Sequence, residues 1–208
     1  FALNIPHYPE QALEMFAERY KELPMPRRSY AAMISSTDHY IGKVLDKLKE
    51  HQLREKTIVV FMSDNGHSAE HSQIRNDGHR SGLKKGHYYG AHGGGGNAGP
   101  FIGHKGTFYE GGLRVPAMIS YPSFLPKGEV RGQAVTSMDW YPTILDLCGL
   151  VAAKNAVIDG KSLVPLIRSK DHKGPHKFMH WAWQKGWAVR LGKWKLISHG
   201  AWDWNPGQ

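Results

Sequence analysis

A buried strand and the loop that leaves it are encoded by Thr57-Ile58-Val59-Val60-Phe61-Met62-Ser63-Asp64-Asn65-Gly66. The run up to Met62 is β-branched, aromatic or otherwise apolar, and it lacks the alternation of a half-exposed strand. This pattern is typical of a strand covered on both faces in a parallel sheet. The run stops at an acid, an amide and a glycine. Because parallel strands end at a common edge of the sheet, the stretch predicts that Asp64 and Asn65 present oxygen atoms there.

Asp64 and Asn65 are a candidate metal-binding pair. A carboxylate beside a carboxamide offers two hard oxygen donors, which suit calcium, or magnesium, better than zinc. The alternative is a plain turn, because Asp, Asn and Gly all tolerate left-handed backbone and Asn-Gly is a strong turn signal. A calcium shell normally takes about six or more oxygens, so further ligands must come from elsewhere.

A second motif, rich in glycine, is Gly103-His104-Lys105-Gly106-Thr107-Phe108-Tyr109-Glu110-Gly111-Gly112-Leu113-Arg114-Val115-Pro116. Together the two motifs resemble the type I (formylglycine-dependent) sulfatases of the alkaline-phosphatase superfamily. The resemblance implies that Asp64 and Asn65 bind a divalent cation, and it favours this reading over the turn. It also implies that Lys105 contacts the sulfate, where an ammonium group can neutralise an oxygen without bidentate geometry.

The resemblance extends to two histidines. His7, in Asn4-Ile5-Pro6-His7-Tyr8-Pro9, corresponds to the family's histidine in a Pro-His turn after a strand. It would donate to the sulfate or to the leaving oxygen, so His7 and Lys105 are the predicted catalytic residues. His67 directly follows the metal-binding tripeptide and is predicted to face the substrate. A hydrogen bond that stabilises the loop explains His67 equally well.

The chain departs from the family at the nucleophile. Sulfatases make formylglycine from Cys or Ser in a Cys/Ser-x-Pro-Ser-x-Arg-like core preceded by a pair of metal-binding aspartates, and neither pattern occurs here. The only cysteine, Cys148, has apolar neighbours at helical spacing, which predicts a small buried side chain. Ser120-Tyr121-Pro122-Ser123 resembles the serine version of this core, but Phe124 follows where an arginine would be needed nearby, so we do not assign the nucleophile to it. We therefore expect the formylglycine upstream of Phe1 and an isolated chain that is inactive.

Elsewhere the sequence alternates between strand and helix patterns. The expected elements are strands over 1–6, 57–62 and 117–121, a helix over 27–51, and a hairpin of 187–190 with 194–197. A second helix is expected within 133–147, opened by Ser and Asp residues with Pro142 early in it. The predicted class is α/β. Residues 1–168 are assigned to an incomplete alkaline-phosphatase-like domain with a mostly parallel sheet flanked by helices. Residues 169–208 are assigned to the beginning of a small antiparallel subdomain.

Residues 67–103 separate the two motifs and are rich in Gly, His and Asn. A stretch of this length without apolar periodicity predicts a long active-site loop. A zinc site is not expected, because its histidines do not occur at a dependable ligand spacing. These histidines, counted through the start of the second motif, are His67, His71, His79, His87, His92 and His104.

The formal charge of +9 and the isoelectric point near 9.6 raise an alternative, a non-catalytic fragment that binds polyanions. The basic residues are dispersed, and no recognition helix, zinc-finger spacing or aromatic binding sheet accompanies them, so no nucleic-acid partner is expected. A positive field also suits a hydrolase of sulfated small molecules or polysaccharides. A phosphodiesterase or phosphonate hydrolase of the same superfamily is the alternative enzyme.

No apolar run is long enough to span a bilayer. The family resemblance implies a periplasmic or extracellular location. The oligomeric state and the alcohol that carries the sulfate stay open.

Overall fold

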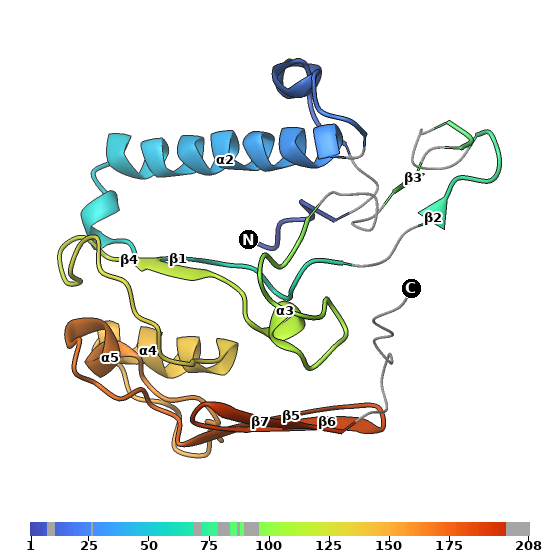
Figure 1. The fold of residues 1–208 in the computed structure, drawn as a ribbon. Helices are drawn as coiled ribbons and strands as arrows, with labels where there is room; N and C mark the ends of the chain where they lie inside the picture. The colour runs from blue at the N-terminus through green and yellow to red at the C-terminus, as the bar shows by residue number, and fades with distance from the viewer. Residues whose placement is uncertain are drawn as a thin grey trace. The chain divides into compact units, whose positions relative to one another are not determined.

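The computed structural model describes residues 1–7, 11–25, 27–68, 72–78, 84–86, 88–89 and 96–198 (Figure 1). They belong to two compact units, one with residues 1–50 and 62–116 and the other with residues 51–61 and 117–198. The boundary expected at residue 168 stays a prediction. In the described part of the chain, none of the helices combines the length and apolar character needed to cross a membrane.

The first unit is built on the long helix α2 (Arg27–Glu50), which confirms the helix expected over 27–51. The short helices α1 (Glu14–Ala17) and η1 (Glu18–Tyr20) pack against it. Phe16 of α1 is buried together with Met33 of α2, so the apolar stripe of α2 is covered at its N-terminal half. The phenol of Tyr20 and the hydroxyl of Ser35 share a hydrogen bond of 2.5 Å across the same contact.

The strand expected over 1–6 is wrong. Residues 1–4 have no regular secondary structure, residues 5–7 form a turn, and the His7 N–H donates to the Asn4 carbonyl at 3.0 Å. A strand needs a neighbour to satisfy its backbone groups. Among the described strands β1 and β4 pair with each other, and none pairs with residues 1–6.

The strands β1 (Val59–Met62) and β4 (Ala117–Ser120) form one two-stranded sheet (Figure 1), which belongs to the second unit except for Met62 at the end of β1. Both expected strands are therefore confirmed at slightly shorter length. The 3-10 helix η2 (Arg54–Lys56) leads into β1, and the Arg54 guanidinium donates to the Ser120 hydroxyl at 2.5 Å. This bond ties the entry of β1 to the end of β4.

A helical region follows β4. It comprises η4 (Ser137–Asp139), α4 (Trp140–Leu147) and α5 (Val164–Arg168), and α4 contacts α5. Asp139 caps this region, because its carboxylate accepts from the Thr136 N–H at 2.8 Å in a capping box. The buried position predicted for Cys148 is wrong: the residue is exposed. Since α4 ends at Leu147, Cys148 falls outside the helical stripe that suggested burial.

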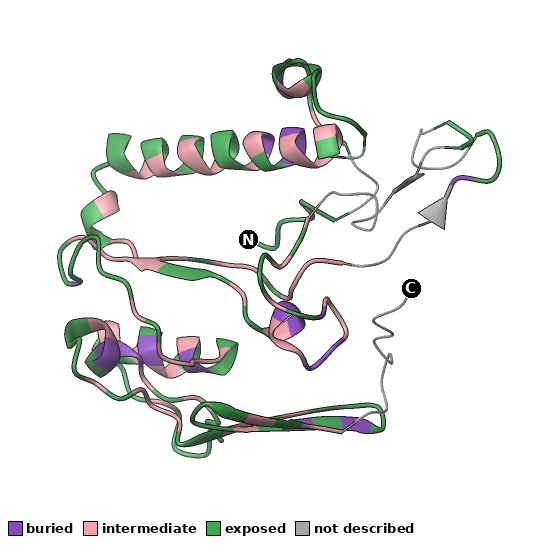
Figure 2. Ribbon diagram, viewed as in Figure 1, coloured by how far each residue is buried: buried purple, intermediate pink, exposed green. Residues whose placement is uncertain are grey.

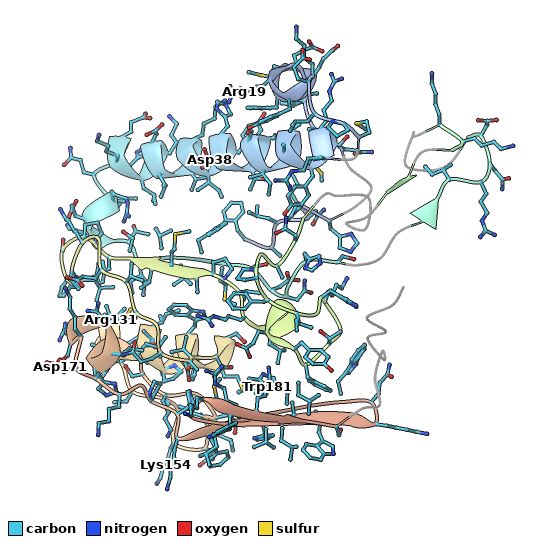
Figure 3. All side chains as sticks on the ribbon, viewed as in Figure 1. Arg19, Asp38, Arg131, Lys154, Asp171 and Trp181 are labelled. Atoms are coloured by element: carbon cyan, nitrogen blue, oxygen red, sulfur yellow. The ribbon has the colours of Figure 1, made fainter. Side chains whose placement is uncertain are left out.

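The end of the described chain forms the antiparallel sheet β5 (Phe178–Trp183), β6 (Gly186–Leu191) and β7 (Trp194–Ile197), in that order. The hairpin of β6 and β7 is confirmed, with Gly192 at φ 56° in its turn; β5 was not predicted. Four tryptophans lie on this sheet, Trp181, Trp183, Trp187 and Trp194. Trp181, labelled in Figure 3, has the Lys195 ammonium 5.1 Å from its ring centroid, whereas Trp194 is 73% exposed.

The region predicted as a long loop contains the short antiparallel pair β2 (Ser72–Gln73) and β3 (Tyr88–Tyr89). Ile74, next to β2, is buried. The expectation for the histidines at positions 71, 79, 87 and 92 lies outside the described residues. The glycine-rich motif begins beyond this region and contains the one-turn helix α3 (Glu110–Leu113).

Candidate active site

The two sequence motifs meet in the first unit. We call residues 63–67 the strand exit and residues 103–114 the lysine loop. The Gly66 N–H donates to the Gly112 carbonyl at 2.9 Å, and the Lys105 N–H donates to the His67 carbonyl at 2.8 Å. The strand exit is thus fastened to the lysine loop at two points, so the backbone that carries Asp64 and Asn65 lies against the backbone that carries Lys105.

Glycine is required at several positions of this junction because backbone packs directly on backbone. A Cβ atom on Gly66 would collide with the Gly111 carbonyl oxygen, and one on Gly111 would collide with the Gly103 carbonyl oxygen. Gly103 itself has φ +91°, which side-chain-bearing residues rarely adopt. Figure 2 shows α3 largely buried, in agreement with the burial of Gly111 and Gly112. The close approach explains why the motif is framed by glycines.

The backbone of Lys105 is held from both sides. Its N–H reaches His67 as described, and its carbonyl accepts from the Nδ1 of His104 at 2.8 Å. Thr107 closes the turn, because its hydroxyl accepts from the His104 N–H at 3.1 Å and donates to the His104 carbonyl at 2.8 Å. The lysine predicted to bind sulfate therefore projects from a preorganised turn.

His104 was not among the predicted site residues. The signal that could have found it is its place directly before Lys105 in the glycine-framed motif.

Asp64 and Asn65 have spare oxygen atoms. Asp64 is exposed, and one carboxylate oxygen accepts from the Asn65 N–H at 2.9 Å. The Asn65 side-chain nitrogen donates to the Gly66 carbonyl at 2.9 Å, while the Ser63 hydroxyl donates to the Asn65 carbonyl at 2.9 Å. Within the described ranges, the second carboxylate oxygen of Asp64 and the side-chain oxygen of Asn65 have no hydrogen-bond partner.

These two oxygens fit a hard divalent cation, because both are neutral or anionic oxygen donors on adjacent residues. They do not complete a shell. The described residues contain no cluster of three or more His, Cys, Asp or Glu side chains able to hold a metal ion.

His67 packs beside His104, with ring centroids 6.4 Å apart and an edge-on arrangement. Its Nδ1 is buried and has no hydrogen-bond partner among the described residues. Burial lowers the pKa of His67, and the electrostatic interaction with His104 lowers it further, so the His67 imidazole favours the neutral form. Gly96 lies beside this residue, since a Cβ there would be 3.2 Å from the Tyr30 hydroxyl, a tight contact, and 3.5 Å from the His67 Cβ, an ordinary one.

His7 lies in an exposed turn of the same unit. Its role toward the sulfate stays a prediction. Arg114 places its guanidinium 4.6 Å from the Phe101 ring centroid, and its N–H donates to the Glu110 carbonyl at 2.8 Å. Arg114 thus holds the end of the lysine loop.

The second unit has a charged cluster of a different kind. The Asp139 carboxylate is fully buried and accepts from the N–H groups of Thr136 and Lys161, each at 2.8 Å. The His176 Nε2 donates to the same carboxylate at 2.8 Å. Every donor comes from the protein itself, so the cluster joins α4 to the segment before β5 and offers nothing to a ligand. No sequence pattern points to His176, because it lies far from Asp139 along the chain.

Comparison with known proteins identifies the family. The family model described as Sulfatase matches residues 2–150. The chain belongs to the sulfatase family. This confirms the resemblance carried by the strand exit and the lysine loop.

Two curated relatives show how much of a sulfatase the chain represents. Human Arylsulfatase D is 36% identical over 163 residues, which cover 77% of this chain and 25% of the relative. Mouse (Mus musculus) Steryl-sulfatase is 34% identical over 151 residues, which cover 73% of this chain and 22% of the relative. The sulfatase chain therefore spans about a quarter of the length of these proteins.

Solved structures confirm the fold. Ps i-CgsB, determined in complex with k-i-k-neocarrahexaose, superimposes with a TM-score of 0.72 at 26% identity and covers 94% of this chain and 39% of its own. The phosphonate monoester hydrolase SpPMH from Silicibacter pomeroyi superimposes with a TM-score of 0.55 at 20% identity, which shows the shared fold alone. The sulfatase chain is thus an α/β chain with the alkaline-phosphatase-like fold of the sulfatases.

Proposed function

We propose that the complete protein hydrolyses sulfate esters, and that this chain supplies part of its metal site and its sulfate-binding lysine. The observation that carries the proposal is the pair of backbone hydrogen bonds that fasten the strand exit to the lysine loop. Those bonds hold the backbone of the two candidate oxygen donors next to the backbone of Lys105, which supports a shared site. Membership of the sulfatase family supports sulfate as the anion. Because the chain spans about a quarter of its relatives, the activity belongs to the complete protein.

In this proposal each predicted residue has a defined role. Asp64 and Asn65 hold calcium, with magnesium as the alternative, and the bound cation would act as a Lewis acid toward the sulfate and the nucleophile. Lys105 neutralises a sulfate oxygen from its fixed turn. His7 donates to the sulfate or to the departing alcohol oxygen, and His67 faces the substrate. The nucleophile is a formylglycine that these residues do not supply.

The proposed substrates are sulfated carbohydrates or aryl sulfates. The neocarrahexaose complex of Ps i-CgsB supports a carbohydrate, as does dog (Canis lupus familiaris) N-acetylgalactosamine-6-sulfatase, which is 33% identical over 139 residues. The charge of +9 supports a polyanionic substrate, since a positive field speeds its association. We also propose that β1 and β4 belong to a larger, mostly parallel sheet, as in the predicted fold.

The test compares ester classes with the complete protein. We expect turnover of 4-nitrophenyl sulfate to exceed that of 4-nitrophenyl phosphate and of a phenylphosphonate monoester. Chelation with EDTA should abolish the activity, and added calcium should restore it more fully than magnesium. Faster turnover of the phosphate or phosphonate ester would contradict the proposed sulfatase activity and favour a phosphodiesterase or phosphonate hydrolase of the same superfamily. Activity that survives complete chelation would show that the reaction does not need the metal ion assigned to Asp64 and Asn65.

A further inference from the structure

We propose that His104 contributes to substrate recognition: its Nδ1 positions Lys105, and its Nε2 accepts a hydrogen bond from a hydroxyl group next to the sulfate ester. The inference rests on the proposed function and narrows the substrate class to sulfated carbohydrates. It assigns His104 two separable tasks, one for each ring nitrogen.

The hydrogen-bond partner of Nδ1 fixes the tautomer of the ring. The Lys105 carbonyl oxygen carries no hydrogen, so at 2.8 Å the Nδ1 of His104 must be the donor. In a neutral imidazole the other nitrogen then carries the lone pair. The Nε2 of His104 is therefore an acceptor, on the residue that directly precedes the sulfate-binding lysine.

This acceptor is available to a ligand. His104 is half-buried, and no described residue forms a hydrogen bond with its Nε2. Among the described residues, the His67 Nδ1 is a buried ring nitrogen without a hydrogen-bond partner. Neither ring nitrogen of His104 is both buried and without a partner. The edge-on contact with His67 and the two bonds of Thr107 hold the ring and its backbone in place.

An acceptor beside a cationic lysine selects for a particular substrate chemistry. The oxygens of a sulfate group have no hydrogen, so they bind Lys105 but cannot donate to a neutral Nε2. A hydroxyl on the neighbouring carbon of a sugar can donate, whereas a simple aryl sulfate has no such group. A site built to bind a hydroxyl discriminates against the analogue that lacks it, because an acceptor that the bound substrate covers is then left unpaired.

The test uses the complete protein and a matched pair of substrates. A set of monosulfated galactosides is first ranked by kcat/KM for the wild-type enzyme. The best substrate is then compared with its analogue in which hydrogen replaces the hydroxyl next to the sulfate ester. We expect the hydroxylated substrate to be preferred by about tenfold, the effect of one good hydrogen bond. No preference in the wild-type enzyme would overturn the inference while leaving the sulfatase activity intact. A wild-type protein that cleaves no sulfate ester would instead refute the proposed function.

Two variants separate the tasks of the ring. The side-chain amide of Asn can occupy the place of Nδ1, so His104→Asn keeps the bond to Lys105 and loses the acceptor. The preference ratio should fall from about ten to about one. His104→Gln reaches the place of Nε2 but not that of Nδ1, so it should keep most of the ratio and lower kcat for both substrates. His51→Asn, a surface histidine, is the matched control. An unchanged ratio in His104→Asn would overturn the role of Nε2.

Discussion

Two aspartates of this chain, Asp64 and Asp139, show how an available carboxylate differs from one that is already used. Asp139 is fully buried, and both of its oxygens accept hydrogen bonds from donors of its own unit. Asp64 is exposed, and its one described bond comes from the next residue in the chain. The first carboxylate therefore stabilises the fold, while the second has an oxygen without a hydrogen-bond partner among the described residues.

The surroundings of the two aspartates differ in the same sense. Asp139 accepts hydrogen bonds from Lys161 and His176, which are distant in the sequence, so the cluster depends on the packing of its whole unit. Around Asp64 the backbone is fixed by glycines and by hydrogen bonds to the lysine loop, while one oxygen of the Asp64 carboxylate has no hydrogen-bond partner among the described residues. A rigid backbone that carries unsatisfied side chains is the expected property of a binding site.

The largest effect is expected from Asp139→Ala. Removing this carboxylate leaves His176 and two backbone N–H groups without their acceptor in a buried position. Loss of one partner of a buried pair costs about 3–5 kcal/mol in the free energy of unfolding. Urea denaturation of the complete protein measures it, with Asp159→Ala at an exposed position as the control, expected within about 0.5 kcal/mol. Wild-type stability in Asp139→Ala would mean that the cluster does not stabilise the fold.

Lys105→Ala is expected to affect catalysis and not the fold. It removes a preorganised positive charge, which should cost about 2–4 kcal/mol of transition-state stabilisation. The measurement is kcat/KM for a sulfate ester at matched calcium occupancy, with thermal unfolding to show that the protein is folded. Lys127→Ala, at an exposed lysine, controls for the loss of charge. Equal rate constants in Lys105→Ala and wild type would show that this lysine does not contact the sulfate.

Asp64→Ala tests the available carboxylate directly. Outer-shell residues alone contribute about 10- to 100-fold to metal affinity, so loss of a charged ligand should weaken calcium binding by about 100-fold or more. Calorimetric titration of the chelated complete protein measures the affinity, and activity should fall in parallel. Asp38→Ala, on the exposed surface of α2 and labelled in Figure 3, is the control. Wild-type calcium affinity in Asp64→Ala would show that Asp64-Asn65-Gly66 forms a turn and does not bind the cation.

The sequence predicted those parts of the molecule that depend on local pattern. Helix α2, strand β1 and the β6–β7 hairpin follow from apolar periodicity and from a turn glycine, and all are present. The meeting of the strand exit and the lysine loop followed from the resemblance to a known family, since nothing local links Gly66 to Gly112.

The failures share a physical cause, which is that the deciding partner lies elsewhere in the chain. Residues 1–6 look like a strand but pair with no described strand. Strand β5 is specified by its register with β6, and His176 by its contact with Asp139. Cys148 has the right neighbours for burial, but α4 ends one residue before it. Local patterns do not encode these outcomes.

The smallest effect is expected at Glu129, a surface carboxylate that contrasts with both aspartates. Its side chain accepts from Arg131 at 3.0 Å and lies 3.1 Å from the Lys170 ammonium. The same Arg131, labelled in Figure 3, donates to the Leu166 and Ile167 carbonyls at the end of α5. Hydrogen bonds from Arg131 first, and then from Lys170, hold the pKa of Glu129 below its usual value of 4.5.

A lowered pKa in the folded state fixes the direction of the pH effect. The stabilisation by Glu129 is fully present above pH 4.5, the usual value, and is lost as the pH falls through the lower folded value. Glu129→Gln should therefore lower the Tm slightly at pH 7, and the difference from wild type should vanish in acid. Glu22→Gln, at an exposed position of the first unit, should show no such dependence. A Tm difference that stays constant from pH 7 into acid would mean that Arg131 holds α5 without help from the charge of Glu129.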